Sequence, residues 1–404
     1  MLPASDLQLA YWRDATRRWN VKCGATRSGK TYMDYFLIPR RLLAVKGLPG
    51  LNVIIGNTRE TIRRNVIEPM QEIYGVRRVS SIHADNSATL FGERCFCLGA
   101  DNASRVNRLR GMSIKYCYGD EVVTWDKGLF DMLKSRLDKP YSRFDGTCNP
   151  ESPEHWFKAF LDSDADIFQQ VYTLDDNPFL DNAVKEAIKT EYAGTVFYDR
   201  YVLGRWVAAE GAIYRAFADH PDRFVTDEPP DVRHVFIGVD FGGNGSAHAF
   251  VTVGVDRTYT RLHVLDEYYR REILSPETLE RDFVDYVKAT VARWKLTAIY
   301  ADSAEQVLIR GLNAAAYRAG LRVEALNSAK KPILDRIRFL CRLMGAGRFT
   351  VDKSCVHLIE ALRTARWNDK RVTRDERLDD GTTNIDSLDA MEYAFERIMG
   401  DMLT

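Results

Sequence analysis

The sequence predicts an α/β protein with two domains, and three observations support this prediction. First, residues 24–31 read Gly-Ala-Thr-Arg-Ser-Gly-Lys-Thr, a full match to the phosphate-binding loop G-x-x-x-x-G-K-[ST]. Second, apolar segments of strand length alternate with longer helical segments, which is typical of parallel sheets. Third, this alternation stops at residues 218–234, a stretch rich in proline and charge, and then begins again.

The composition is that of a globular chain. Of the 404 residues, 45% are hydrophobic and 28% are charged, and no apolar run approaches the roughly 20 residues of a membrane-spanning helix. The 57 basic residues balance the 57 acidic ones, which argues against a constitutive, tight DNA binder. Two local arginine clusters, residues 57–65 and 103–111, remain candidates for phosphate contacts. The seven scattered cysteines suit a reducing compartment.

The phosphate-binding loop is expected between a strand and a helix. Trp19, Val21 and Cys23 alternate with polar residues, as in a strand that leads into the loop. Residues 32–44 are predicted to form the helix behind it, with Pro39 ending or kinking that helix. Backbone N–H groups of such a loop hold nucleotide phosphates, while its lysine and final hydroxyl reach the phosphates and Mg²⁺. The residues assigned to the loop are Gly24, Ala25, Thr26, Arg27, Ser28, Gly29, Lys30 and Thr31.

A helix over residues 5–18, capped by Ser5 or Asp6, is predicted before this strand. The elements predicted after the loop are a strand at 51–58, an arginine-bearing helix at 59–75, and strands at 88–92 and 94–100. These elements continue the pattern of a parallel α/β sheet, in which a nucleotide binds at the carboxyl ends of the strands.

Asp120 and Glu121 end the next predicted strand, in which Ile114, Tyr116 and Tyr118 alternate with other residues. An Asp-Glu pair at a strand end beside a phosphate-binding loop is what ATP hydrolysis needs. Asp120 is predicted to hold Mg²⁺, and Glu121 is predicted to polarise the attacking water.

Residues 144–157 contain a strand that ends in small polar residues, followed by a turn bounded by prolines. Thr147 or Asn149 is in a position to sense the γ-phosphate of the nucleotide. An ordinary turn is the alternative, and it would be preferred if the other motifs were missing.

The second half has its own chemistry, beginning with a buried strand that delivers Asp240 and two strands joined by a short turn. Ser275-Pro276-Glu277 has the cap, proline and acid of a helix start. The next strand delivers Asp302. A helix ending near Gly320, a strand at 321–326 and a last helix starting near Asp386 complete the predicted domain.

Four aspartates in this half form a candidate metal site. Asp240 and Asp302 each follow an apolar strand, and Asp386 and Asp389 share one helix face because they are three residues apart. Clustered carboxylates repel each other and are tolerated mainly where cations neutralise them. Two divalent ions held there could activate a water and stabilise the leaving oxygen of a phosphodiester. Taken singly, each aspartate could equally be a cap or turn residue.

The order of these motifs resembles that of the large subunit of tailed-phage terminases, the motor-nucleases that package viral DNA. The segments that carry the resemblance are GATRSGKT, LRGMSIK before GDE, TCNPESPEHW, LGRWVAAEGAIY, VDFG, YADSAE and IDSLDAMEY. The resemblance implies a P-loop ATPase domain of the ASCE type with a parallel sheet at 1–210. It further implies a linker at 211–233 and an RNase H-like nuclease domain with a mixed sheet at 234–404.

In the first domain, the resemblance implies that Gln8 contacts adenine and that Arg27 acts inside the phosphate-binding loop. Arg110 resembles the arginine that a neighbouring subunit inserts into the active site. The resemblance also implies that Lys30 and Thr31 are phosphate and Mg²⁺ ligands. It implies that Asp120 and Glu121 are the Walker B pair, and that the coupling motif spans Thr147 to Asn149.

In the second domain, the resemblance implies that Asp240, Asp302 and Asp389 bind Mg²⁺ or Mn²⁺, with Asp386 a further or alternative ligand. Lys330 and Lys331 fall in a basic segment that could hold the DNA backbone. The implied activities are ATP hydrolysis and metal-dependent endonucleolytic cleavage of DNA.

The partners implied by the resemblance are double-stranded DNA, the portal protein and the small terminase subunit. A homo-oligomeric ring, typically a pentamer, is expected on the procapsid, and a monomer is expected in solution. The expected location is the host cytoplasm and, transiently, the procapsid portal vertex, without a membrane. One alternative is a helicase or repair ATPase fused to an RNase H-like nuclease; another is a structural protein with a vestigial site.

Overall fold

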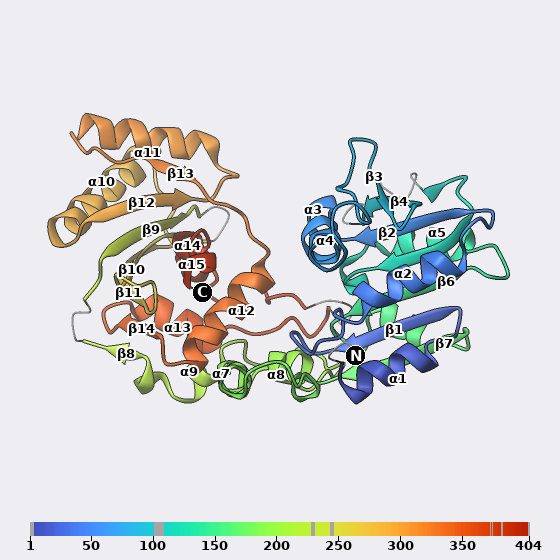
Figure 1. Ribbon diagram of the computed structural model, residues 1–404. Helices are drawn as coiled ribbons and strands as arrows, with labels where there is room; N and C mark the ends of the chain where they lie inside the picture. The colour runs from blue at the N-terminus through green and yellow to red at the C-terminus, as the bar shows by residue number, and fades with distance from the viewer. Residues whose placement is uncertain are drawn as a thin grey trace. The chain divides into compact units, whose positions relative to one another are not determined.

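A computed structural model describes residues 4–100, 109–227, 231–242, 246–371, 373, 375–380 and 383–402. The chain forms two compact units, the first comprising mainly residues up to 186 and 196–208. The second comprises mainly residues 187–195, 209–371 and 375 onward (Figure 1). None of the described helices combines the length and the hydrophobicity that a membrane-spanning segment requires.

The first unit is built on a seven-stranded sheet, counted over the described residues, in the order β3-β4-β2-β5-β6-β1-β7. All neighbouring strands run parallel except β3 and β4, so the predicted parallel sheet is confirmed with one antiparallel edge. The strands are β1 (Trp19–Gly24), β2 (Leu51–Gly56), β3 (Ser87–Leu90), β4 (Glu93–Gly99), β5 (Ile114–Gly119), β6 (Arg143–Cys148) and β7 (Ile167–Tyr172).

Helices cover both faces of this sheet. One face packs against α5 (Lys127–Arg136) and α6 (Trp156–Leu161), and the other against α2 (Asp34–Ala44) and the helices after β2. The remaining helices of this part are α1 (Asp6–Asp14), α3 (Arg59–Ile62), η1 (Arg63–Ile67), α4 (Glu68–Tyr74), η3 (Val122–Thr124), η4 (Leu174–Asp176) and α8 (Val196–Tyr201). Helix α7 (Asn182–Tyr192) has residues in both units.

Strand β1 is buried along its whole length, although its sequence alternates apolar and polar residues. Both sheet faces are covered, so the polar side chains need buried partners. Asn20 donates to the carbonyl of Phe144, and the Lys22 ammonium lies 2.5 Å from the carboxylate of Asp34 at the start of α2. The alternation therefore separates an apolar face from a face of buried hydrogen bonds.

The helix predicted at 59–75 is interrupted by one π-helical turn, η1. Pro69 has no N–H, so it cannot donate to the carbonyl of Asn65 four residues earlier. That carbonyl instead accepts a hydrogen bond of 3.1 Å from the Tyr35 hydroxyl. The π turn therefore lies just before a proline, and turns of this kind often occur at functional sites.

The second unit contains a seven-stranded mixed sheet, again counted over the described residues, in the order β13-β12-β9-β10-β11-β14-β8. Strands β9, β10 and β11 are antiparallel neighbours and the other pairs are parallel, so the predicted mixed sheet is confirmed. The strands are β8 (Val225–Thr226), β9 (His234–Asp240), β10 (His248–Val255), β11 (Leu262–Arg270), β12 (Leu296–Ala301), β13 (Ala325–Asn327) and β14 (Phe349–Asp352).

One face of this sheet packs against α10 (Pro276–Arg293) and α11 (Gln306–Arg318), and α14 (Asp386–Phe395) lies against β9 and β10 (Figure 1). Helix α14 approaches β9 closely at Gly238, where an added Cβ would lie 1.7 Å from the carbonyl oxygen of Ala390. The other helices are α9 (Arg215–Asp219), η5 (Pro221–Arg223), α12 (Ile333–Gly345), α13 (Val356–Thr364) and α15 (Met399–Met402).

The segment 211–233, predicted to be a linker, instead contributes α9, η5 and strand β8 to the second unit in its described part. Strand β8 pairs with β14. Phe217 and Phe224 are buried and stack at 5.4 Å. These two aromatic side chains anchor a segment whose prolines and charges, taken alone, indicate a loop.

Candidate functional site

The phosphate-binding loop leaves β1 at Gly24, next to the backbone of Tyr172 at the end of β7. An added Cβ at Gly24 would lie 2.0 Å from the Tyr172 carbonyl oxygen, and Gly24 has φ +152°, so only glycine fits. The loop also contains Gly29 with φ +81° and the exposed Arg27 with φ +56°. Helix α2 begins three residues after Thr31, behind a series of tight turns.

Lys30 folds back over the loop. Its ammonium donates to the carbonyl of Ala25 at 2.9 Å and to the side-chain oxygen of Asn149 at 2.6 Å. The side chain is 7% exposed, and this burial lowers the pKa of Lys30 below its usual value. The structure therefore brings together the loop lysine and the polar residue that follows β6.

Asp120 and Glu121 follow β5, and the Thr147 hydroxyl at the end of β6 links them. This hydroxyl donates to Oδ1 of Asp120 at 3.0 Å and accepts from the backbone N–H of Glu121 at 3.2 Å. Glu121 has φ +51°, a left-handed conformation that costs about 1–2 kcal/mol for such a residue. Strain of this kind is typical of functional sites.

Asn65, which the sequence did not indicate, completes the surroundings of Asp120. Asn65 lies in the π turn η1, and its side-chain amide donates a hydrogen bond of 3.0 Å to Oδ2 of Asp120. Its side-chain oxygen accepts at 3.2 Å from the guanidinium of Arg64, within the arginine cluster 57–65. In the sequence, Pro69 is the only indication of the π turn, and it can be interpreted only when the fold is known.

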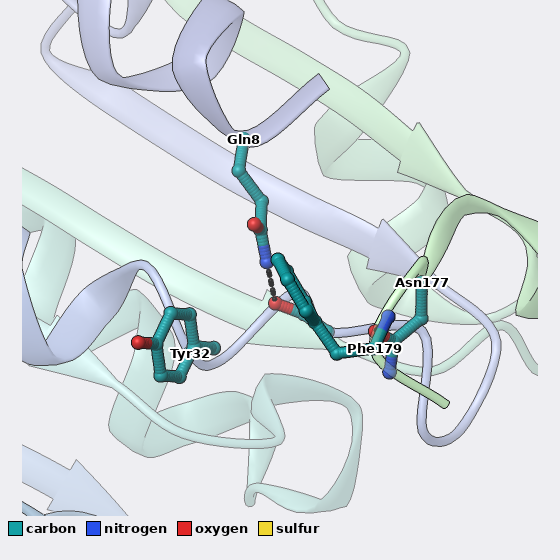
Figure 2. A pocket seen from close by; sticks show the side chains of 5 residues that line it. Gln8, Tyr32, Asn177 and Phe179 are labelled. Atoms are coloured by element: carbon teal, nitrogen blue, oxygen red, sulfur yellow. Dashed lines mark hydrogen bonds between the residues drawn. The ribbon is translucent and has the colours of Figure 1, made fainter. Parts of the chain in front are cut away.

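A cavity of about 330 Å³ opens beside the loop (Figure 2) and is lined by Gln8, Gly29, Tyr32, Asn177 and Phe179. Gln8 donates to the carbonyl of Gly29 at 2.8 Å, which ties α1 to the loop. In Figure 2 the rings of Tyr32 and Phe179 lie on either side of this hydrogen bond. Two aromatic walls and an amide suit a flat heteroaromatic base.

Both arginines predicted to act on the nucleotide are exposed. Arg27 stands at the tip of the loop, where its carbonyl accepts from the side chain of Asn177 at 2.8 Å. Arg110 lies in a turn before β5. Residues 103–108 of the second arginine cluster lie outside the residues that the structure describes.

In the second unit, the four predicted acids lie around the carboxyl end of β9. Asp240 ends β9 and shares the sheet face of Gly238, on which α14 packs. Asp302 follows the neighbouring parallel strand β12 and donates its N–H to the carbonyl of Val239 at 3.0 Å. Asp386 and Asp389 lie in the first turn of α14.

These carboxylates act on one another electrostatically. Burial, followed by the charges of Asp389, Asp386 and Asp302, raises the pKa of Asp240 well above its usual range. Burial likewise raises the pKa of Asp386, although its carboxylate accepts from the N–H of Ala247 at 2.8 Å. The site therefore contains excess negative charge that a cation would relieve.

Cations of the chain already neutralise two of the four acids. Asp389 accepts at 2.5 Å from Arg377, which also pairs with the fully buried Glu392 at 3.0 Å. Asp302 lies 3.2 Å from the ammonium of Lys330. In the part of the chain that is described, no three His, Cys, Asp or Glu side chains form a ready-made metal cluster.

The donor set nevertheless fits a divalent metal. Carboxylate oxygens are the preferred ligands of Mg²⁺ and Mn²⁺, and burial, together with the neighbouring carboxylates, raises the pKa of Asp240. Asp240, Asp302, Asp386 and Asp389 are the residues that could hold such an ion. The network of Arg377 and Glu392 beneath them is a feature that sequence reasoning missed.

Comparisons with known proteins match both halves of the chain to one protein family. Residues 23–218 match the N-terminal model of the T4-like type of terminase large subunit, and residues 240–397 match the terminase RNase H-like domain. The large terminase subunit of Escherichia phage T5 is 25% identical, across 95% of this chain and 88% of that protein.

Solved structures agree as well. The large terminase of the thermophilic bacteriophage D6E superposes with a TM-score of 0.82 at 25% identity, covering 97% of this chain and 98% of that one. A structure of the D6E protein with ATP-gamma-S has a TM-score of 0.79 at 24% identity, with the same coverage of both chains. The chain thus belongs to the bacteriophage terminase large subunits, which join a packaging ATPase domain to an RNase H-like nuclease domain.

Proposed function

We propose that this protein hydrolyses ATP to move double-stranded DNA into a procapsid and cuts concatemeric DNA with its second unit. The observation that carries the proposal is that Thr147 links Asp120 to Glu121 beside the phosphate-binding loop. The same chain supplies four mutually repelling aspartates on an RNase H-like sheet. A motor that also cuts its substrate needs both sites.

In the ATPase unit, the phosphates of ATP lie in the loop 24–31 and Lys30 moves from Asn149 to reach them. Thr31 and Asp120 hold Mg²⁺, which neutralises charge on the phosphates when it is bound. Glu121 orients the attacking water. The related D6E terminase has been solved with ADP and with ATP-gamma-S, which supports the use of a nucleotide by this chain.

The two exposed arginines have different roles, and only Arg110 acts on a nucleotide held by a neighbouring copy. Arg27 acts within its own loop, and Arg110 reaches the site of the next subunit in a ring, a pentamer on the procapsid. Arginine donated in this way stabilises the charge of the transition state. The free protein is then a monomer with low ATP turnover.

In the nuclease unit, Asp240, Asp302 and Asp389 hold two divalent ions, with Asp386 as a further ligand. Such ions, when bound, lower the pKa of a water and stabilise the leaving oxygen. The partners of the protein are duplex DNA, the portal protein and the small terminase subunit. The protein works in the host cytoplasm and at the portal vertex.

A triplex-displacement assay tests the motor. With ATP, the protein on portal-bearing procapsids should displace a short third strand from a duplex without separating the duplex strands. A helicase or repair enzyme would instead release single strands from a forked duplex. Lys30→Ala is the matched negative control. Strand separation without triplex displacement would favour the helicase.

Phe179→Ala should raise the KM for ATP about 5- to 150-fold, because stacking of a base on an aromatic side chain contributes about 1–3 kcal/mol. The turnover number should change little, since the ring does not touch the phosphates. Leu9→Ala is a suitable control because Leu9 is exposed on α1 and does not line the cavity. A KM within twofold of the wild-type value would exclude this cavity as the base site.

A further inference from the structure

The carboxylate of Glu396, at the end of α14, holds the backbone of the segment 329–331. Glu396 is fully buried, and its two oxygens accept from the N–H groups of Ala329, Lys330 and Lys331. The hydrogen bonds to Lys330 and Lys331 measure 3.2 and 3.1 Å. Three convergent N–H groups satisfy a buried carboxylate, so this contact fixes the segment rigidly.

The backbone held in this way is strained at Lys330, which has φ +50°. A residue with a Cβ adopts this left-handed conformation at a cost, so the surrounding structure must impose it. This backbone conformation directs the side chain of Lys330 toward Asp302, and the Lys330 ammonium lies 3.2 Å from Oδ1 of Asp302. Glu396 therefore places a cation at one of the four acids.

The cations at the two neutralised acids differ in mobility. Arg377 on Asp389 has a side chain 4% exposed and a second partner in the buried Glu392. The side chain of Lys330 is 51% exposed, and that of Asp302 is 21% exposed. An exposed lysine pair is weak and easily broken, whereas a buried arginine held by two carboxylates is fixed. Only the lysine can leave without unfolding its surroundings.

We propose that Lys330 is a built-in counter-ion of Asp302, which a divalent metal must displace, and that Glu396 is the residue that positions it. This inference rests on the proposed nuclease function. In the absence of DNA, the ammonium competes with the metal for Asp302. When DNA binds, a phosphate offers Lys330 another anionic partner and frees Asp302. Metal loading is thereby coupled to the presence of substrate, which limits cleavage by the unengaged protein.

Isothermal titration of the full chain with MnCl₂, without DNA, tests the competition. Lys330→Met should tighten Mn²⁺ binding on the order of fivefold, the strength of one exposed ion pair. Lys353→Met is the matched control, because Lys353 forms an exposed pair with Asp227 at 2.9 Å in the same unit. It should leave Mn²⁺ binding unchanged. Glu396→Gln, if it melts cooperatively, should tighten binding as Lys330→Met does.

A short duplex with uncleavable phosphorothioate linkages provides the second arm. Addition of this duplex should tighten Mn²⁺ binding by the wild type several-fold. The same duplex should tighten Mn²⁺ binding by Lys330→Met to a smaller extent. Mn²⁺ binding by Lys330→Met that is equal to or weaker than wild type would overturn the proposal. Asp302→Ala distinguishes failure of the proposed metal site from failure of the proposed role of Lys330. If this variant still binds Mn²⁺ as the wild type does, the metal site itself is wrong.

Discussion

Glu121→Gln is expected to lower ATP turnover about 10²–10⁴-fold, the usual contribution of a positioned general base. Glutamine keeps the size of the side chain but cannot take a proton from water. The hydrogen bond from residue 121 to Thr147 comes from the backbone, so the substitution leaves it in place. Phosphate release at saturating ATP and Mg²⁺ measures the effect.

The control for this experiment is Glu154→Gln, an identical change at an exposed position of the same unit. It should turn over ATP at the wild-type rate. Cleavage of plasmid DNA with Mn²⁺ should be retained by Glu121→Gln, because the two sites are built from different sheets. If Glu121→Gln kept most of its ATP turnover, the role of Glu121 would be wrong.

Much of the fold could be predicted because backbone geometry limits which residues a phosphate-binding loop accepts and where the ends of parallel strands lie. A phosphate-binding loop needs glycine where the backbone comes close to a neighbour, as Gly24 does to Tyr172. Parallel strands bring their carboxyl ends to one edge, so Asp240 and Asp302 meet although 62 positions separate them. For the same reason Asp120 and Thr147 meet at the ends of β5 and β6.

What could not be predicted depends on side chains that meet only after packing. The amide of Asn65 reaches Asp120 from the π turn, and no local pattern places that turn beside β5. Phe179 lines the base cavity from a segment that has no periodicity of its own. Glu396 looks like a surface residue of a terminal helix, yet it is fully buried against three N–H groups.

The nuclease site gives the second large expected effect. Asp240→Ala, Asp302→Ala and Asp389→Ala should each lower Mn²⁺-dependent plasmid cleavage about 10³-fold or more, because a bound metal supplies several kcal/mol of transition-state stabilisation. Each variant should keep its ATP turnover, which serves as the control for folding. Asp386→Ala should be milder, since its carboxylate is already held by the N–H of Ala247.

The outcomes across the four variants discriminate between assignments. Full cleavage activity in Asp240→Ala or Asp302→Ala would contradict the proposed two-metal site. An inactive Asp386→Ala beside an active Asp389→Ala would make Asp386 the third ligand and leave Asp389 as a partner of Arg377.

Stability measurements on Asp240→Asn give an independent reading of the same charges. The folded protein raises the pKa of Asp240, so the carboxyl group binds its proton more tightly in the folded state than in the unfolded one. Its stabilising contribution is complete below the usual pKa of about 3.9 and is lost as the pH rises through the folded-state value. At neutral pH without metal, asparagine should therefore raise the Tm by about 2–4 °C for each kcal/mol of burial cost and repulsion relieved. The gain should shrink on acidification, whereas Asp302→Asn should bring none, because it removes the partner of Lys330.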